Sequence, residues 1–376
     1  MVYIIITAIL LLPWLIIPIG GIPEPTRLIK STFFDFFMMA VIVFGLYKGL
    51  KFKYSNKYLS LLTLWIFITF GFNWYYYLLV GKGYNAGTID SMLHFILALI
   101  GSVFVMCSLE GEDFVKICKA IWFSSVAVSV FAFFQVIGLD PMVEISHYVQ
   151  KEHRHVAALL DHPDLLGNYL AISVPFILYL SKPKYLVSLL LVLFVILCTK
   201  SRISILAVLV SVPIFLCFKY KHFKNTKYIA IIYSLCVLAL IFLNSSFNKI
   251  SDGFSGRLWA WNEMVHRIDN PIFGNGLGIV KSLMVKMGDN YWSYAHNDYL
   301  EIYCSLGAFG LFLFILVLIN SFRKFSYKPN NILGMCYLSS FVAFLIICLG
   351  SFPMEIAPLA LGGLISWWGM ERLGYV

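Results

Sequence analysis

The fold class follows most directly from residues 298–320, which read DYLEIYCSLGAFGLFLFILVLIN. Beyond Glu301 this stretch contains no charged residue as far as Asn320. A helix of roughly 20 apolar residues is long enough to cross the hydrocarbon core of a bilayer. The stretch therefore predicts a helix that spans a membrane, and the polar residues before it predict a loop that returns to the membrane there.

Comparable apolar runs fill most of the 376 residues. Of these residues, 60% are hydrophobic, 17% are aromatic and only 12% are charged, whereas a soluble domain carries about a quarter charged residues. This composition excludes a water-soluble enzyme, a disordered chain and a solenoid of repeats. It predicts an all-α polytopic membrane protein with a single integral membrane domain over residues 1–376. About twelve transmembrane helices are expected, at residues 2–20, 32–47, 58–80, 89–108, 115–138, 164–180, 185–199, 203–218, 228–243, 298–320, 332–350 and 355–370.

The basic residues orient the chain in the membrane. They avoid the apolar runs, and more than half of the 28 Lys and Arg residues fall in alternate loops. Short loops rich in Lys and Arg stay in the cytoplasm, so both termini are predicted to be cytoplasmic. The net charge of +9 is therefore an effect of membrane topology and does not indicate nucleic-acid binding. The loops concerned are residues 48–57, 109–119, 181–184, 219–227 and 321–330, together with Arg372.

Two predicted external segments are too long to be simple connections. They are a short external loop at residues 139–163 and a long external loop at residues 244–297. Long loops in compact domains are usually functional, so the longer one is the candidate catalytic loop. Within it, RLWAWNEMVHRI at residues 257–268 has helical apolar spacing and predicts a short amphipathic helix at the membrane surface. PIFGNGLG, at residues 271–278, is interpreted as a tight loop and not as a phosphate cradle.

Two arginines in the external segments are candidates for binding an anion. Arg202 lies in CTKSRIS at the start of a predicted helix, where a cation opposes the helix dipole unless an anion lies nearby. Arg257 opens the amphipathic segment, and its guanidinium offers a planar fork of donors that suits phosphate oxygens. The alternatives are an interfacial Arg202 that extends to the lipid headgroups and a surface Arg257 paired with Glu263.

His296 is the candidate general base, in YAHNDYLEIYCSLG, where the long external loop returns to the membrane. An imidazole takes up a proton near neutral pH, which suits it to this chemistry. Asp298 is a candidate for orienting the ring, with Glu301 on the same helix. The alternative is that Asn297 and Asp298 cap the helix that begins there. Upstream, Tyr294 offers a face on which a sugar ring could stack, or it belongs to an interfacial aromatic belt.

The shorter external loop contains several histidines, among them His155. Imidazole and carboxylate groups are common metal ligands, but their spacing here matches no zinc pattern, and His155 equally suits a polar edge that faces a substrate. The eight cysteines form no CxxC pair and are interpreted as small hydrophobic residues. No metal and no cofactor is therefore expected. The remaining candidate ligands of this loop are His147, His153, Asp161 and His162.

The order of these segments resembles the O-antigen ligase and O-antigen polymerase superfamily of membrane glycosyltransferases. The resemblance rests on HPDLLGNYL before a mid-chain span, TKSR at a span edge, GRxxxWxxM and NPIFGxGLG in the long loop, and AHNDYLEIYCSLGAFGLFLF at its end. By motif it covers about residues 155–320, and by topology it covers the whole chain.

The resemblance implies a helical fold of the GT-C type, with its catalytic loop on the periplasmic face of the bacterial inner (cytoplasmic) membrane. It implies a glycan donor carried on undecaprenyl pyrophosphate, with Arg202 and Arg257 binding the pyrophosphate and His296 activating or orienting an acceptor hydroxyl. Attack at the anomeric carbon would invert its configuration without a metal or a nucleotide sugar. The residues expected to support the site or contact the acceptor are His155, Tyr294, Asn297, Asp298 and Glu301.

The favoured hypothesis is an O-antigen ligase-like transfer to lipid A–core. The close alternative is a polymerase that extends a lipid-linked glycan, because the long external loop carries few cations to grip a phosphorylated acceptor. A transporter of lipid-linked glycans is the alternative from a different class. A transporter is expected to place charges inside its spans and to show an internal repeat, whereas Asp35, Asp90 and Glu355 are predicted at or near span ends and no repeat is detected.

Overall fold

A computed structural model of the chain describes residues 1–15, 25–49, 57–79, 86–139, 156–158, 160, 162–180, 182–219, 257–277, 295–325 and 331–374. These residues form helices joined by turns and contain no strand, which confirms the prediction of an all-α chain. The helices are α1 (Val2–Leu11), α2 (Pro25–Tyr47), α3 (Lys57–Leu79), α4 (Ala86–Ser108), α5 (Gly111–Val136), α7 (Pro163–Leu180), α8 (Pro183–Thr199), α9 (Arg202–Lys219), α11 (Arg257–His266), α13 (Asp298–Lys324), α14 (Ile332–Cys348) and α15 (Ala357–Gly374). Two single 3-10 turns, Leu12–Trp14 and Pro353–Glu355, adjoin α1 and α15.

The described helices lie over the predicted spans and support a multi-pass membrane protein. Four of them contain a stretch that is long and apolar enough to cross a membrane, judged by length and composition, and several shorter apolar helices accompany them. A total of twelve spans stays a prediction, and the predicted span at residues 228–243 lies outside the described residues. The four stretches are Lys30–Tyr47, Gly111–Val136, Pro163–Leu180 and Asp298–Lys324.

The described part of the first predicted span, residues 2–20, is not one continuous α-helix. Helix α1 ends at Leu11, and the 3-10 turn that follows it contains Pro13 and ends at Trp14. Proline has no amide N–H to continue a helical hydrogen-bond ladder, which accounts for the end of the regular α-helix just before Pro13. The part of this span beyond Leu15 lies outside the described residues.

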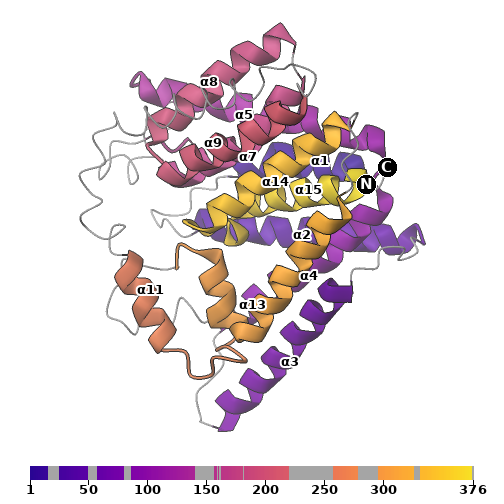
Figure 1. Ribbon diagram of the computed structural model, residues 1–376, viewed down its shortest axis with the longest axis vertical. Coiled ribbons are helices and arrows are strands. Elements are labelled where there is room, and N and C mark those ends of the chain that lie inside the picture. The colour runs from indigo at the N-terminus through magenta and orange to yellow at the C-terminus, as the bar shows by residue number, and fades with distance from the viewer. Residues whose placement is uncertain are drawn as a thin grey trace.

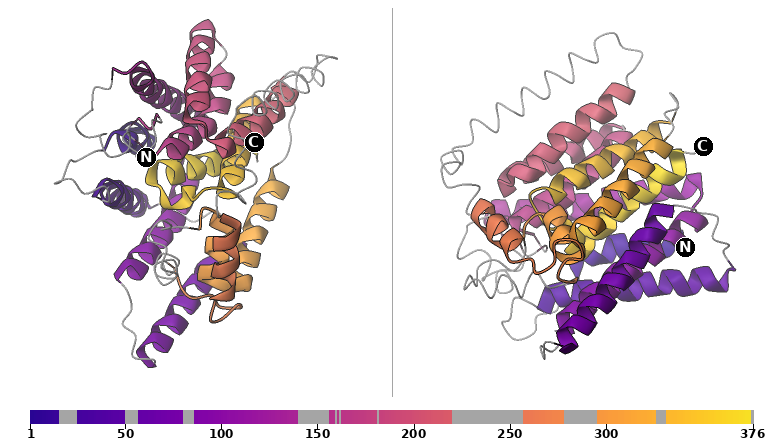
Figure 2. Two further views of the ribbon diagram at one scale, coloured as in Figure 1. Left: turned by 90° about the vertical axis from the view of Figure 1, so that its left-hand side faces the viewer. Right: turned by 60° about the horizontal axis from the view of Figure 1, so that its bottom comes forward.

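Helices α7, α9, α14 and α15 form the centre of the bundle. Helix α14 packs against the other three and lies in the middle of the view in Figure 1. The fully buried ring of Tyr337 on α14 meets the rings of Phe114 and Phe176 edge-on, with centroids 5.3 and 5.0 Å away. Helix α3 packs along α13, and Figure 2 shows this pair beside the central helices. The bundle therefore holds α13, which follows the candidate catalytic loop, from two sides.

The start of α1 and the end of α15 lie on the same side of the bundle in Figure 1 and in the right-hand view of Figure 2. On that side, Arg372 Nε near the end of α15 donates to the carbonyl oxygen of Leu109 in the α4–α5 turn, at 3.3 Å. Both residues belong to segments that the basic residues predict to be cytoplasmic. The α14–α15 turn is at the other end of α15 from Arg372, on the predicted external side. The start of α9 is also predicted to be external.

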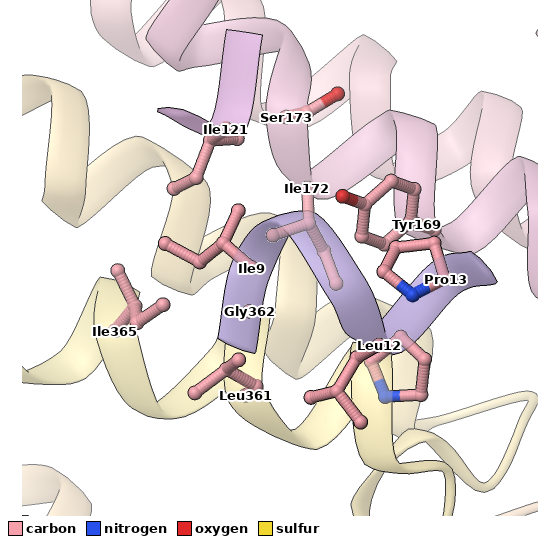
Figure 3. Close-up of a pocket in the computed structure, with 11 residues that line it drawn as sticks. Ile9, Leu12, Pro13, Ile121, Tyr169, Ile172, Ser173, Leu361, Gly362 and Ile365 are labelled. Atoms are coloured by element: carbon pink, nitrogen blue, oxygen red, sulfur yellow. The ribbon is translucent and has the colours of Figure 1, made fainter. Parts of the chain in front are cut away.

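A small apolar pocket lies where α1, α5, α7 and α15 meet (Figure 3). Beside it, Ser124 Oγ lies 2.7 Å from the hydroxyl of Tyr169 and donates to the carbonyl oxygen of Ile9 at 3.1 Å. These hydrogen bonds join three helices that are distant in sequence. They attach α1, which ends at Leu11, to the central bundle.

A larger apolar pocket, with ≈ 760 Å³ of empty space, lies between α3, α4, α13, α14 and α15. Among the described residues that line it, His94 is the ionisable one, and its Nδ1 lies 2.7 Å from Asp35 Oδ1 of α2. Helix α2 begins at Pro25, earlier than the predicted span at residue 32. The stretch of α2 that is apolar enough to cross a membrane begins at Lys30, so Asp35 lies near the start of that stretch, as expected.

Candidate functional site

Arg202 is the first residue of α9 and lies at the turn that joins α8 to α9. Helix α8 ends at Thr199, and Lys200 closes it in the left-handed conformation, with φ of 55°. The Arg202 side chain is exposed. The structure thus confirms the expected location of Arg202, at the edge of two apolar helices and at a helix N-terminus.

Arg257, the first residue of α11, is partly buried and lies against the turn between α14 and α15. Its Nη1 donates to the carbonyl oxygen of Gly350 at 2.8 Å. Its Nε is buried and has no hydrogen-bond partner in the part of the chain that the structure describes. The suggested pairing with Glu263 is wrong, because Glu263 Oε2 accepts from Arg267 Nη2 at 3.3 Å instead.

The electrostatic environment of Arg257 connects it to the other candidate arginine. Burial lowers the pKa of the Arg257 guanidinium, the Asp164 carboxylate raises this pKa, and the Arg202 guanidinium lowers it. A guanidinium remains charged at physiological pH despite such a shift. The fold therefore brings two cations from α9 and α11 close enough to repel each other, with Asp164 as the nearby carboxylate.

The turn between α14 and α15 contacts Arg257, Asn168 and His296. We call residues 350–354 the 350–354 loop. Gly350 accepts from Arg257, Ser351 Oγ accepts from Asn168 Nδ2 at 3.0 Å, and Phe352 lies against the ring of His296. The sequence does not predict this loop, because the two apolar runs at residues 332–350 and 355–370 leave only a short turn between them. Nothing in the local sequence marks its role, apart from Gly350 and Ser351 within an otherwise apolar region.

His296 lies directly before α13 and meets Phe352 edge-on, with ring centroids 4.8 Å apart and planes at 87°. Its backbone has φ of 52°, a left-handed conformation that non-glycine residues rarely adopt. The preceding residue is held from both sides. Trp261 Nε1 donates to the Ala295 carbonyl at 2.6 Å, and the Ala295 N–H donates to Glu301 Oε1 at 2.7 Å. These bonds hold the backbone next to His296 in place, so that its imidazole lies between α11, α13 and the 350–354 loop.

The polar side chains of Asn297, Asp298 and Glu301, which follow His296, each accept a hydrogen bond from a different backbone amide. Asn297 caps α13, since its side-chain oxygen accepts from the Leu300 N–H at 3.0 Å. Asp298 is buried, and its Oδ2 accepts from the Met354 N–H at 3.1 Å. The expected capping role is therefore confirmed for Asn297, whereas Asp298 binds the 350–354 loop and Glu301 binds back to Ala295.

The glycine-rich segment PIFGNG packs into a break in α13. At Gly307 φ is 70°, so the helix is interrupted there and carbonyl groups of the preceding turn lose their helical partners. The Asn275 N–H donates to Cys304 O at 2.8 Å and the Gly276 N–H donates to Ser305 O at 2.9 Å. The amides of Gly274, Asn275 and Gly276 all have partners within the protein. This arrangement agrees with the interpretation as a tight loop and not as a phosphate cradle.

Several sequence-based candidates lie outside the described residues. They are His147, His153, His155, Asp161 and Tyr294. His162 is exposed, and its Nδ1 accepts from the Asp164 N–H at 3.1 Å. Among the residues that the structure describes, no group of three or more His, Cys, Asp or Glu side chains is placed to hold a metal ion.

Residues 187–315 match the family model described as O-antigen ligase. The matched segment runs from α8 into the second half of α13 and includes Arg202, Arg257 and His296. No curated protein matches the chain.

Proposed function

We propose, from the premise that this chain belongs to the O-antigen ligase and O-antigen polymerase superfamily, that it transfers a glycan from undecaprenyl pyrophosphate to an acceptor hydroxyl. The reaction takes place on the external face of the membrane. The first candidate acceptor is lipid A–core, so that the protein acts as an O-antigen ligase.

The observation that carries this proposal is the environment of Arg257. A buried cation needs partners, yet this one lies near Arg202 and leaves its Nε without a hydrogen bond in the described part of the chain. A pyrophosphate would supply negative charge for both guanidinium groups and an oxygen for the Nε–H. It would also bind in the bidentate manner that suits arginine. The leaving group of the proposed reaction therefore suits the charge of the two arginines and the unpaired Nε–H of Arg257.

The proposed chemistry then needs only a positioned acceptor and a base. The acceptor oxygen attacks the anomeric carbon of the donor sugar, and the bond from that carbon to the pyrophosphate oxygen breaks. The electron pair leaves with the polyprenyl pyrophosphate, where the two arginines stabilise the developing charge. His296 takes the hydroxyl proton. A single displacement of this kind inverts the anomeric configuration.

The large apolar pocket supports a donor attached to a lipid. Met354 of the 350–354 loop lines it, and so does Leu345, whose carbonyl oxygen accepts from the Tyr299 hydroxyl at 3.1 Å. The pocket thus begins beside the residues that hold His296 and continues among apolar helices. The side chains that line it are almost all apolar, from Leu59 of α3 to Trp367 of α15. Part of a polyprenyl chain fits such a space chemically.

A polymerase is the second candidate function. It is favoured by the small number of cations in the long external loop. Of the two described there, Arg267 is already paired with Glu263. A ligase that holds a phosphorylated lipid A–core is expected to use more positive charge than this.

A transfer assay with purified protein tests the proposal. The protein is given an undecaprenyl-pyrophosphate oligosaccharide in EDTA, with lipid A–core either present or absent. Product on lipid A–core establishes a ligase, whereas a ladder of longer lipid-linked glycans without that acceptor establishes a polymerase. If neither product forms and the protein instead moves the donor across vesicle membranes, the transporter hypothesis replaces the enzyme. Loss of transfer in EDTA that a divalent cation restores would contradict metal-independent chemistry.

A further inference from the structure

Asn168 of α7 is a buried amide at the centre of a hydrogen-bond network beneath the two arginines. Its side chain is completely shielded from solvent. Both ends of the amide have partners: Ser204 Oγ donates to Oδ1 at 2.8 Å, and Nδ2 donates to Ser351 Oγ at 3.0 Å. A buried polar network of this kind stabilises one arrangement of its members, because any other arrangement leaves a buried donor or acceptor without a partner.

The Oδ1 end of this amide holds the first turn of α9. Ser204 lies two residues after Arg202, and its hydroxyl also lies 2.7 Å from Ser201 Oγ. The turn is closely packed on α7 at Gly167. A Cβ atom at Gly167 would lie 2.6 Å from Ser204 Oγ and 2.8 Å from Thr199 Oγ1. The position of the Arg202 backbone is therefore set by contact with α7.

The Nδ2 end of the amide holds the 350–354 loop. Ser351 directly follows Gly350, whose carbonyl oxygen accepts from Arg257. The first turn of α9 also touches this loop, since a Cβ atom at Gly350 would lie 3.2 Å from Ile203 Cδ1. One amide thus connects the two elements that carry or hold the arginines.

We propose that Asn168 is a positioning residue that sets the separation of Arg202 and Arg257, and thereby the fit of the pair to a pyrophosphate. This inference rests on the proposed function. It goes beyond it by assigning the geometry of the arginine pair to a residue that is remote from both in sequence and touches neither the donor nor the acceptor. The bidentate geometry of guanidinium and phosphate makes binding sensitive to such a separation.

The test measures binding of sugar-free undecaprenyl pyrophosphate, with undecaprenol as the reference ligand that lacks phosphate. Asn168→Leu keeps the volume of the side chain and removes both hydrogen bonds, and Ser351→Ala removes only the bond to the loop. Ser173→Ala is the matched control, because Ser173 is a buried residue of α7 whose hydroxyl bonds only within its own helix, to Leu170 O at 2.7 Å. Each variant is prepared both in the wild-type background and with Arg257→Lys.

We expect Asn168→Leu to weaken pyrophosphate binding by about ten-fold, with a smaller loss in Ser351→Ala and none in Ser173→Ala. Undecaprenol binding is expected to stay unchanged in all of them. With Arg257→Lys already present, Asn168→Leu should cause little further loss, because residues that act through one another are not additive. In transfer assays the donor KM should rise while kcat changes less.

Equal losses in both backgrounds would overturn the inference, and so would wild-type pyrophosphate binding by both Asn168→Leu and Ser351→Ala. If Asn168→Leu does not fold, Ser351→Ala decides by the same criteria. If the wild-type protein binds undecaprenyl pyrophosphate no better than undecaprenol, the proposed function itself is contradicted. That result distinguishes its failure from a failure of the inference about Asn168.

Discussion

Arg257 Nη1 donates to the carbonyl oxygen of Gly350 at 2.8 Å, across 93 residues of sequence. The donor belongs to the external helix α11 and the acceptor to the turn between two apolar helices of the bundle. A cation of the candidate site is thus held by the membrane domain and not by its own loop. The same turn contacts His296 through Phe352 and Asp298 through Met354, so the groups proposed for leaving-group binding and for proton transfer share one support.

Replacement of Arg257 by lysine is expected to impair transfer strongly. A lysine ammonium has no planar fork, so it does not reproduce both the bond to Gly350 and a bidentate contact with phosphate. We expect kcat/KM to fall by roughly 10²–10³, the size seen when one donor to a developing negative charge is removed. Arg267→Lys is the matched control on the same segment, since Arg267 is exposed and paired with Glu263. Wild-type kcat/KM in Arg257→Lys would contradict pyrophosphate binding by this residue.

His296→Asn separates the chemistry of the imidazole from the unusual backbone at this position. Asparagine tolerates the left-handed conformation, with φ of 52°, but it cannot take a proton near neutral pH. We expect kcat to fall by about 10²–10⁴, with undecaprenyl pyrophosphate binding retained. Single-turnover transfer and ligand binding measure the two quantities separately. A variant with normal kcat would remove His296 as the base.

Asp298→Ala is expected to loosen the 350–354 loop. It removes the acceptor of the Met354 N–H and leaves that partly buried donor without this partner. A buried unsatisfied donor costs about 1–3 kcal/mol, so thermal stability and transfer should both decrease. Asp298→Asn keeps an acceptor oxygen and is predicted to retain most of the activity. Equal kcat values for Asp298→Ala and the wild type would show that the loop does not need this bond.

Gly307→Ala should destabilise the fold of the catalytic region. A Cβ atom there would clash with the Ile272 carbonyl oxygen, and the residue has φ of 70°. The matched control is Gly71→Ala in α3, where a Cβ atom meets nothing within 4 Å and alanine favours the helix. We expect a lower melting temperature, measured in detergent, for Gly307→Ala alone. Equal melting temperatures for the two variants would show that the break in α13 is not required.

Much of the architecture could be predicted from the sequence, because apolar runs of sufficient length and the turns between them are local signals. The positions of Arg202 at a helix start and of Asn297 at a helix cap are local in the same way. The pairing of Asp35 with His94 was missed because α2 starts earlier than its apolar run suggests. Where charged residues precede the run, hydropathy alone sets the helix start too late.

The parts of the site that could not be predicted are contacts between distant segments. The sequence around Arg257 does not indicate its hydrogen bond to Gly350, and the sequence around Asn168 does not indicate its hydrogen bond to Ser351. Gly307 likewise reads as one more small residue in an apolar helix. Only its packing against the segment that contains Gly274 shows that the helix is broken there.

The release of sugar-free undecaprenyl pyrophosphate from a glycan-loaded donor is the most direct test of the proposed reaction. Mass spectrometry would follow this lipid and the transferred glycan together, with purified wild-type protein and with Arg257→Lys. We predict that the wild type releases one undecaprenyl pyrophosphate for each glycan transferred, and that Arg257→Lys releases it far more slowly. A donor that stays intact with the wild-type protein, in the presence of lipid A–core and of a lipid-linked glycan acceptor, would contradict glycan transfer by this chain.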